Sequence, residues 1–269
     1  MKETGKSLRH VKVRETNISK TKMDVMKKTD FYYNDIIRRN RDVIRQLEKF
    51  FDLREIANEK MHKRGRLNNT WMRALTSDYK HCFTKKNPEE KVPITILVDV
   101  SGSMCFYRLK VAKEACVVFC EALDKVVDLR LVLFTGIYDA VNVVVKDFGE
   151  RLDPRKVDMI GGVHGQGENL DGASILHEAK INKGGVIIAF SDGRPTGDRY
   201  GMAHAVEDVR EANKLAQVYA FVIDHEPGSK WMSDLYGHGN YVVVQADNPK
   251  DFKAKFLKFG QLIVKKFMG

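Results

Sequence analysis

Hydrophobic and polar residues alternate with two different periodicities along this chain, and the change from one to the other lies near residue 91. From about Asp30 to residue 56, apolar side chains recur at the 3.6-residue spacing of an amphipathic helix, with arginines on or near the opposite face. From Lys91 onward, short apolar runs alternate with amphipathic segments, which is the pattern of strands and helices in turn. Residues 1–29 are polar, basic and without periodicity, so we expect a flexible arm there.

The alternation of strands and helices from Lys91 onward predicts a doubly wound α/β fold, with a mainly parallel sheet covered by helices on both faces. The expected strands are 94–99, 129–135, 141–146, 185–190, 217–223 and 241–245, and the expected helices are 107–126, one starting near Asp171, 201–216 and 249–267. The 141–146 run follows its predecessor too closely for a helical crossover, so it should be an antiparallel edge strand in a hairpin. The predicted organisation is a basic arm over 1–29, a helical region over 30–90 and an α/β domain over 91–269.

Two of the predicted strands end in an acidic residue. The run ITILVDVSGSMC passes from a buried strand to Asp99, with Ser101 and Ser103 on the turn that follows, and the run GVIIAFSDG ends in the same way at Asp192. Ligands of open α/β sheets bind at the carboxyl edge, where neighbouring strands would bring these oxygens to one ion. Such an oxygen-only set suits Mg²⁺ or Mn²⁺. The structural alternative is an ordinary turn in which Asp99 or Ser103 caps the next helix.

Charge is distributed unevenly along the chain. The net charge is +10, and residues 1–90 hold 23 Lys and Arg against 13 Asp and Glu, while the rest of the chain is balanced. An excess of this kind favours acidic partners, nucleic acid included. The aromatic residues of this region do not repeat as a stacking platform would require, and no nucleic-acid motif is present. Nucleic-acid binding through the basic region is therefore the alternative and not the favoured function.

Composition limits the protein's location. A hydrophobic content of 43% is enough for a core, and no apolar run approaches the roughly 18–20 residues of a membrane span. The N-terminal run MKETGKSLRHVKVRE has no apolar segment and does not read as a secretory signal. The four cysteines form no C-x-x-C pair, and Cys116 and Cys120 are expected in the core. A reducing cytoplasm is the expected location, with no membrane partner.

On these motifs the chain resembles a von Willebrand factor type A (VWA) domain. The matching features are D-V-S-G-S at 99–103, the hairpin after the second strand and S-D-G at 191–193. In that family the D-x-S-x-S loop forms a metal-ion-dependent adhesion site on a doubly wound sheet. The resemblance covers roughly 91–267. It implies that Asn169 or Asp171, on the middle loop, reaches the ion directly or through water; capping of the next helix by Asp171 is equally open.

A closer likeness is to the cobaltochelatase T subunit and the nitric oxide reductase activation protein D (NorD) group. It is carried by G-E-N-L-D-G-A at 167–173, by S-D-G-R-P from residue 191 and by the basic lead-in with G-R-L at 65–67. The resemblance implies a non-catalytic adaptor whose bound ion docks an acidic residue of a partner. The implied partners are an AAA+ ATPase of the MoxR type, similar to the cobaltochelatase S subunit, and a protein client, in a remodelling or metal-chelatase complex.

Other residues are weighed against this function. Hydrolysis at the same ion is disfavoured, because the D-x-D pattern, the G-x-S-x-G elbow and the Walker loop are all missing. The candidate partner-binding residues around the metal face are Met104, His164, Arg194 and Trp231. His164 lies in a glycine-rich loop and is expected to be a loop residue, not a ligand. Trp231 is expected either as an exposed contact beside the metal or as packing under the loop.

Overall fold

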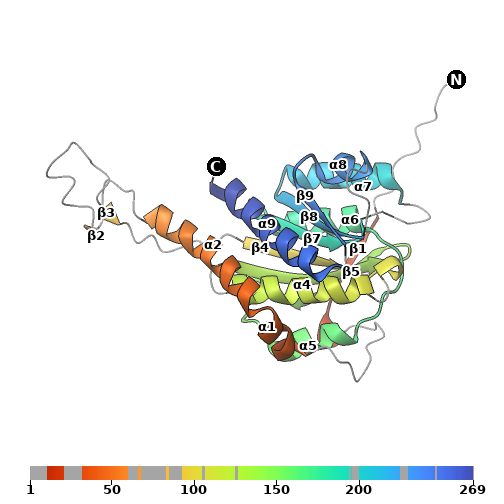
Figure 1. Ribbon diagram of the computed structural model, residues 1–269. Helices are drawn as coiled ribbons and strands as arrows, with labels where there is room; N and C mark the ends of the chain where they lie inside the picture. The colour runs from red at the N-terminus through yellow and green to blue at the C-terminus, as the bar shows by residue number, and fades with distance from the viewer. Residues whose placement is uncertain are drawn as a thin grey trace.

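A seven-stranded sheet forms the centre of the molecule, in the order β1-β6-β5-β4-β7-β8-β9 (Figure 1). The computed structural model describes residues 11–20, 32–59, 66–67, 83–84, 93–104, 107–124, 127–193, 195, 200–224, 230–245 and 247–268. The strands of the sheet are β1 (Val13–Asn17), β4 (Pro93–Asp99), β5 (Asp128–Gly136), β6 (Ala140–Lys146), β7 (Val186–Ser191), β8 (Gln217–Ile223) and β9 (Tyr241–Val244). A separate antiparallel pair joins β2 (Arg66–Leu67) and β3 (Phe83–Thr84).

Neighbouring strands of the main sheet run parallel except β5 and β6, which are antiparallel. The predicted α/β fold with a mainly parallel sheet is therefore confirmed. Each strand predicted from the sequence is present within a single residue of its expected bounds. Their near-continuous apolar sequence reflects burial on both faces of the sheet, which parallel strands require.

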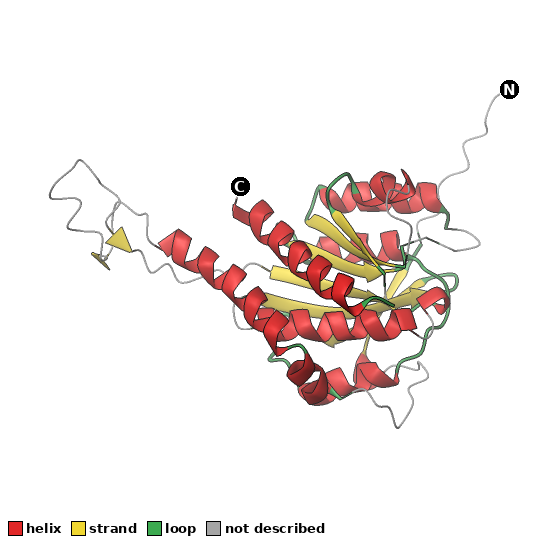
Figure 2. Cartoon of the chain, in the orientation of Figure 1, coloured by secondary structure: helices red, strands yellow, loops and turns green. Residues whose placement is uncertain are grey.

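Helices cover both faces of the sheet (Figure 2). They are α1 (Tyr33–Arg39), α2 (Arg41–Glu59), α4 (Tyr107–Leu123), α5 (Pro154–Gly162), α6 (Asp171–Ile181), α7 (Met202–Asn213), α8 (Lys230–Tyr236) and α9 (Pro249–Met268), with short 3-10 turns η1 (Ile18–Lys20) and η2 (Gly102–Met104). Side chains leave β4 toward both layers: Ile96 and Val98 pack in one cluster with α4 and α9, and Leu97 packs in the other with α6 and α7. None of the helices in the described part of the chain is both long and apolar enough to cross a membrane.

The first two helices share the core of the sheet domain. Ile36 of α1 and Val43 and Leu47 of α2 are buried in the same cluster as α4 and α9. Gly260 of α9 makes room for this contact, because a Cβ atom there would lie 2.4 Å from Cδ2 of Leu47. The helical region expected over 30–90 therefore packs onto the domain expected over 91–269, at least through the first half of α2.

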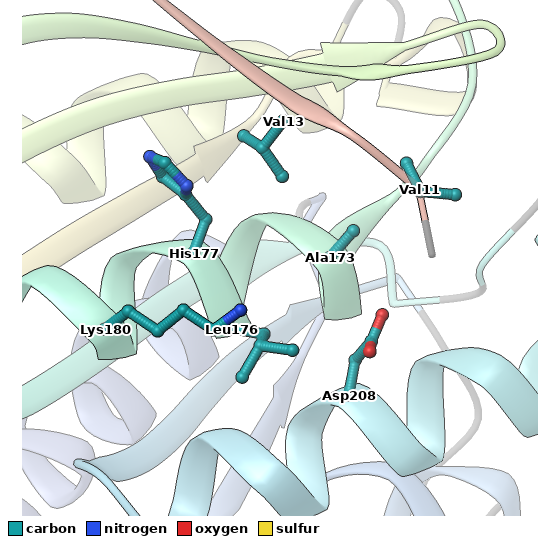
Figure 3. A pocket seen from close by; sticks show the side chains of 7 residues that line it. All are labelled: Val11, Val13, Ala173, Leu176, His177, Lys180 and Asp208. Carbon is teal, nitrogen blue, oxygen red and sulfur yellow. The ribbon is translucent and has the colours of Figure 1, made fainter. Parts of the chain in front are cut away.

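The structure corrects the prediction for the N-terminal arm. Residues 13–17 form β1, which pairs in parallel with β6 along Val13–Asn17 and Ala140–Val144. The strand at 140–146 is antiparallel to β5 as predicted, but it is not the edge of the sheet, because β1 covers it. Val11 and Val13 face Ala173 and Leu176 of α6 across a hollow of about 150 Å³ (Figure 3). The charged residues Lys12, Arg14 and Glu15 interrupt the apolar pattern, so the sequence did not predict this strand.

A buried cation lies beneath β1. Arg130 of β5 is 2% exposed, and its Nε atom donates to Oε2 of the fully buried Glu178 at 2.8 Å. Its other nitrogens bind Asp147 and Glu15. Glu15, His177 and Glu178 lie close enough to hold a metal ion, with ligand atoms within 4.8 Å of one another. Because Arg130 already forms ion pairs with Glu15 and Glu178, we interpret this cluster as an ion-pair network that fastens β1 to the sheet.

Candidate metal site

The carboxyl ends of β4 and β7 bring the two predicted acids together. The strands are neighbours in parallel register, with Val98 opposite Phe190. Strand β4 ends at Asp99 and strand β7 ends at Ser191, directly before Asp192. Parallel strands end at the same edge of a sheet, which is where open α/β folds bind ligands.

Asp99 is the most firmly held residue of the site. It is fully buried, and its Oδ1 atom accepts a hydrogen bond from the backbone N–H of Ser101 at 2.8 Å. Its Oδ2 atom accepts from Asn169 Nδ2 and from Ser191 Oγ, both at 2.8 Å. Burial, together with the nearby negative charge of Asp192, raises the pKa of Asp99 to about 7. The side chain is therefore fixed in place but costly to ionise without a compensating cation.

The two serine hydroxyls lie side by side on the turn after β4. Ser101 Oγ and Ser103 Oγ are 3.0 Å apart; Ser101 is buried and Ser103 is exposed. Between them, the backbone N–H of Gly102 donates to the carbonyl of Gly167 at 2.9 Å, which ties this turn to the middle loop. The pair thus forms the solvent side of the site, while Asp99 forms its floor.

Asp192 presents an unsatisfied oxygen. The residue is 4% exposed, and its Oδ1 atom is buried without a hydrogen-bond partner in the described part of the chain. Its Oδ2 atom lies 3.4 Å from Nη1 of Arg108. A buried carboxylate oxygen without a partner carries a desolvation cost that a cation would remove.

Asn169 and Asp171 lie at the site, and both are engaged by hydrogen bonds. The Asn169 amide nitrogen faces Asp99, and its Oδ1 atom accepts from the backbone N–H of Asp171 at 2.9 Å. Asp171 Oδ1 accepts from the N–H of Gly172 at 2.7 Å, and Oδ2 accepts from the hydroxyl of Tyr236 at 2.9 Å. Burial raises the pKa of Asp171 to about 7 as well, and the charge of Asp192 adds to the effect. These contacts suit residues that hold the site in shape.

Asp171 is not the N-cap residue of the next helix, as the capping alternative required, although its side chain accepts from an N–H of the first turn. Helix α6 begins at Asp171 itself, and Leu170 at the N-cap position makes no side-chain cap hydrogen bond. The N–H groups of Asp171 and Gly172 are instead bound by Asn169 Oδ1 and Asp171 Oδ1. Asp171 therefore occupies the first turn of the helix, where a negative charge is favoured by the helix dipole.

The four predicted partner-binding residues have different fates. Met104 is fully buried in the larger core cluster, so the prediction that it lies on a binding surface is wrong; its apolar side chain anchors η2 instead. His164 is exposed on the middle loop. Trp231 is half-buried and packs over the turn after β7, where a Cβ atom on Gly193 would lie 2.6 Å from its ring. Arg194 lies outside the described residues.

Sequence reasoning did not assign three residues that the structure brings to the site. They are Ser191, Arg108 and Asp224. Ser191 and Asp224 carried a readable signal, because each stands at the end of an apolar strand, as Asp99 does. Arg108 lies on a helix, and its approach to the site depends on how α4 packs.

The residues present fit a divalent cation. Carboxylate and hydroxyl oxygens from Asp99, Ser101, Ser103 and Asp192 form a hard donor set of the kind that Mg²⁺ and Mn²⁺ prefer. The unpartnered Oδ1 atom of Asp192 and the raised pKa of Asp99 both mark negative charge that the protein itself leaves partly uncompensated. A cation here would supply that charge, and it would leave room on the Ser103 side for a further ligand.

Comparison with solved structures shows the same fold. The D319A mutant of the PilB minor pilin from Streptococcus sanguinis is 13% identical, with 69% of this chain and 65% of that chain covered and a TM-score of 0.51. A von Willebrand factor type A protein from Catenulispora acidiphila is 18% identical over 67% of this chain, with a TM-score of 0.48; the match spans only 43% of that longer chain. The manganese-loaded TRAP protein of Plasmodium vivax is 16% identical over 62% of this chain and 74% of its own, with a TM-score of 0.46.

Comparison by sequence identifies the family. No curated protein matched the chain. The family described as VWA domain containing CoxE-like protein matches residues 31–221, from α1 to the middle of β8. The likeness to the cobaltochelatase T and NorD groups stays a prediction, because the matching family is the CoxE-like one. On the fold, the strand-end acids and this match, the chain belongs to the family of VWA-domain-containing CoxE-like proteins.

Proposed function

We propose that this chain is a non-catalytic adaptor that binds Mg²⁺ or Mn²⁺ and uses the ion to dock an acidic residue of a partner protein. The observation that carries the proposal is the buried Oδ1 atom of Asp192, which has no hydrogen-bond partner in the described part of the chain. It belongs to the same strand-end cluster as Asp99 and the two serine hydroxyls, so a cation would complete an otherwise unbalanced set of oxygens.

The ligand roles follow from the contacts. Asp99 and Asp192 would supply the negative charge, Ser101 and Ser103 the neutral oxygens, and Asn169 and Asp171 would hold the site or bind through water. Mg²⁺ requires six ligands and commonly keeps several waters. Because Ser103 is exposed, a carboxylate from another protein can replace a water on that side. Such a contact adds affinity and tests the partner's geometry.

We further propose that the partners are an AAA+ ATPase of the MoxR type, similar to the cobaltochelatase S subunit, and a protein client. This part rests on the resemblance carried by residues 167–173 and by S-D-G-R-P from Ser191. In such a complex the ATPase would supply the work of remodelling or metal insertion, and this chain would connect it to the client. The basic region over residues 1–90, much of it outside the described residues, would bind an acidic face of either protein.

A two-stage experiment tests the proposal. Isothermal titration of the EDTA-treated chain with Mg²⁺ and Mn²⁺ should give one site that Asp99→Ala and Asp192→Ala abolish. Asp35→Ala is the control, because it removes an exposed acid that pairs with Arg38 on α1. An unchanged titration in the Asp99→Ala variant would reject the metal site.

The second stage identifies the partner. The tagged chain is incubated with native lysate in Mg²⁺ or EDTA, and bound proteins are identified by mass spectrometry. We expect an AAA+ ATPase of the MoxR type with the wild-type chain in Mg²⁺, and its loss in EDTA or with Asp99→Ala. Retention of the same proteins under all conditions would reject docking through the ion.

A further inference from the structure

Arg108 is a cation that pairs with Asp192 of the candidate metal site. It stands in the first turn of α4 and is 38% exposed. Its Nη1 atom lies 3.4 Å from Asp192 Oδ2 and 3.3 Å from the carbonyl oxygen of Ser103, and its Nε atom lies 3.2 Å from Asp224 Oδ2. All three contacts are at least 3.2 Å long, and the guanidinium is shared between the carboxylates of Asp192 and Asp224.

Asp224 gives Arg108 a second carboxylate outside the predicted ligand set. It follows β8 at the same edge of the sheet, and its backbone N–H donates to Val244 O at 2.8 Å. Its φ of 58° lies in the left-handed region that non-glycine residues rarely adopt. Such a backbone persists only where its surroundings hold it, so the position of Asp224 beside Arg108 is built into the fold.

We propose that Arg108 is a built-in competitor of the metal ion. In the metal-free protein its guanidinium neutralises Asp192, and a cation bound to Asp192 displaces it toward Asp224. The inference rests on the metal site of the proposed function. It specifies that Arg108 balances the charge of Asp192 in the metal-free site, and that the ion must displace this guanidinium in order to bind.

Asp192 does not depend on Arg108 for its position. Its neighbour Gly193 donates its backbone N–H to Ser191 Oγ at 2.8 Å, and Trp231 packs over Gly193. Arg108 contacts only Oδ2 of Asp192, which leaves Oδ1 for the ion. Loss of the arginine therefore removes a repelling positive charge without removing the contacts that hold the turn at Asp192, and metal binding should become tighter.

Titration of four variants of the full chain with Mn²⁺ alone tests the inference. Arg108→Gln is expected to bind Mn²⁺ about tenfold more tightly, because a unit positive charge near the ion is removed. Asp224→Asn should bind it about threefold more weakly, because Arg108 then has only Asp192 to neutralise. In the double variant, Asp224→Asn should have no further effect. Arg39→Gln is the matched control, because Arg39 of α1 pairs with Glu114 of α4, the helix that also carries Arg108.

The outcomes separate this inference from the proposed function. Absence of a Mn²⁺ site in the wild-type chain would overturn both. A wild-type site with unchanged or weaker binding in Arg108→Gln would overturn only the role of Arg108. Additive effects in the double variant would also overturn it, because independent charges and not a shared guanidinium would then explain the data.

Two further comparisons test the inference even if Arg108→Gln folds poorly. Arg108→Lys keeps the charge, so its Mn²⁺ affinity should stay close to that of the wild type. Tighter binding in Arg108→Lys, similar to that expected of Arg108→Gln, would overturn the competition. Asp224→Asn tests the same relationship without any change at Arg108, and asparagine tolerates the left-handed backbone at that position.

Discussion

The hydroxyl of Tyr236 donates a hydrogen bond of 2.9 Å to Oδ2 of Asp171, and both side chains are fully buried. The bond joins the end of α8 to the start of α6, directly behind the candidate metal site. Burial and the neighbouring acids raise the pKa of Tyr236 well above its usual value, so the phenol keeps its proton and serves as a donor. Asp171 is thereby held as a supporting carboxylate of the site.

Replacement of this phenol should be costly. Tyr236→Phe is expected to lower the free energy of unfolding by about 1–3 kcal/mol, because a buried carboxylate loses a hydrogen bond. Urea denaturation in EDTA measures the effect, with Tyr107→Phe on the exposed start of α4 as the control. Equal stability of Tyr236→Phe and the wild type would show that Asp171 does not need this donor.

The two raised pKa values predict an unusual pH dependence. In the folded metal-free chain, Asp99 and Asp171 titrate at about 7, above their ordinary 3.8. Between these values the folded state binds more protons than the unfolded state, so the free energy of unfolding should fall as the pH rises from about 4 to about 7. Bound Mg²⁺ needs ionised carboxylates, so its affinity should rise over the same range. Urea midpoints measured in EDTA across this range would contradict the assignment if they increase with pH.

Gly167 should tolerate no side chain. It has a φ of 72°, and a Cβ atom there would lie 2.2 Å from the carbonyl oxygen of Gly136 and 2.8 Å from Thr135 Oγ1. Gly167→Ala is expected to lower the free energy of unfolding by about 3 kcal/mol, since backbone strain and a backbone clash add. Gly149 has the same φ with nothing within 4 Å, so Gly149→Ala should cost only about 1 kcal/mol. Similar costs in the two variants, measured by urea denaturation, would rule out the clash.

The buried and exposed partners of Arg130 should differ in importance. Glu178 is fully buried and accepts from both Arg130 and Asn142, so Glu178→Gln weakens a buried charge-assisted hydrogen bond and should cost about 1.5–3 kcal/mol. Glu15 has a side chain that is 39% exposed, so Glu15→Gln should cost less than about 1 kcal/mol. Denaturation curves of the two variants provide the comparison. A larger loss of unfolding free energy for Glu15→Gln than for Glu178→Gln would show that the exposed pair of Arg130 with Glu15 contributes more than the buried pair with Glu178.

The features that could be predicted from the sequence are those that depend on consecutive residues of one segment. An apolar strand that ends in Asp99 or Asp192 predicts both the strand and the position of the carboxylate, because the edge of a parallel sheet collects strand ends. Cys116 and Cys120 were expected in the core, and both are buried and free.

The features that were missed depend on tertiary packing or on short segments. Strand β1 has five residues, of which Arg14 and Glu15 are charged, and only its pairing with β6 makes it a strand. Helix α5 has a start signal in the sequence, Asp153 before Pro154, and the aspartate accepts from the N–H of Arg155. The helix has only nine residues, so its hydrophobic periodicity is weak. Arg108 approaches Asp224 across 116 positions of sequence, and no local pattern links the two.

The position of β1 has a consequence for the order of folding. Arg14 of this strand and Asp139, at the turn before its partner β6, form an ion pair across 125 positions of sequence. During synthesis β1 therefore leaves the ribosome long before the strand that it joins. Because β1 pairs only with β6, it can join the sheet only after the hairpin of β5 and β6 has formed, and it must wait for that hairpin although it is synthesised first.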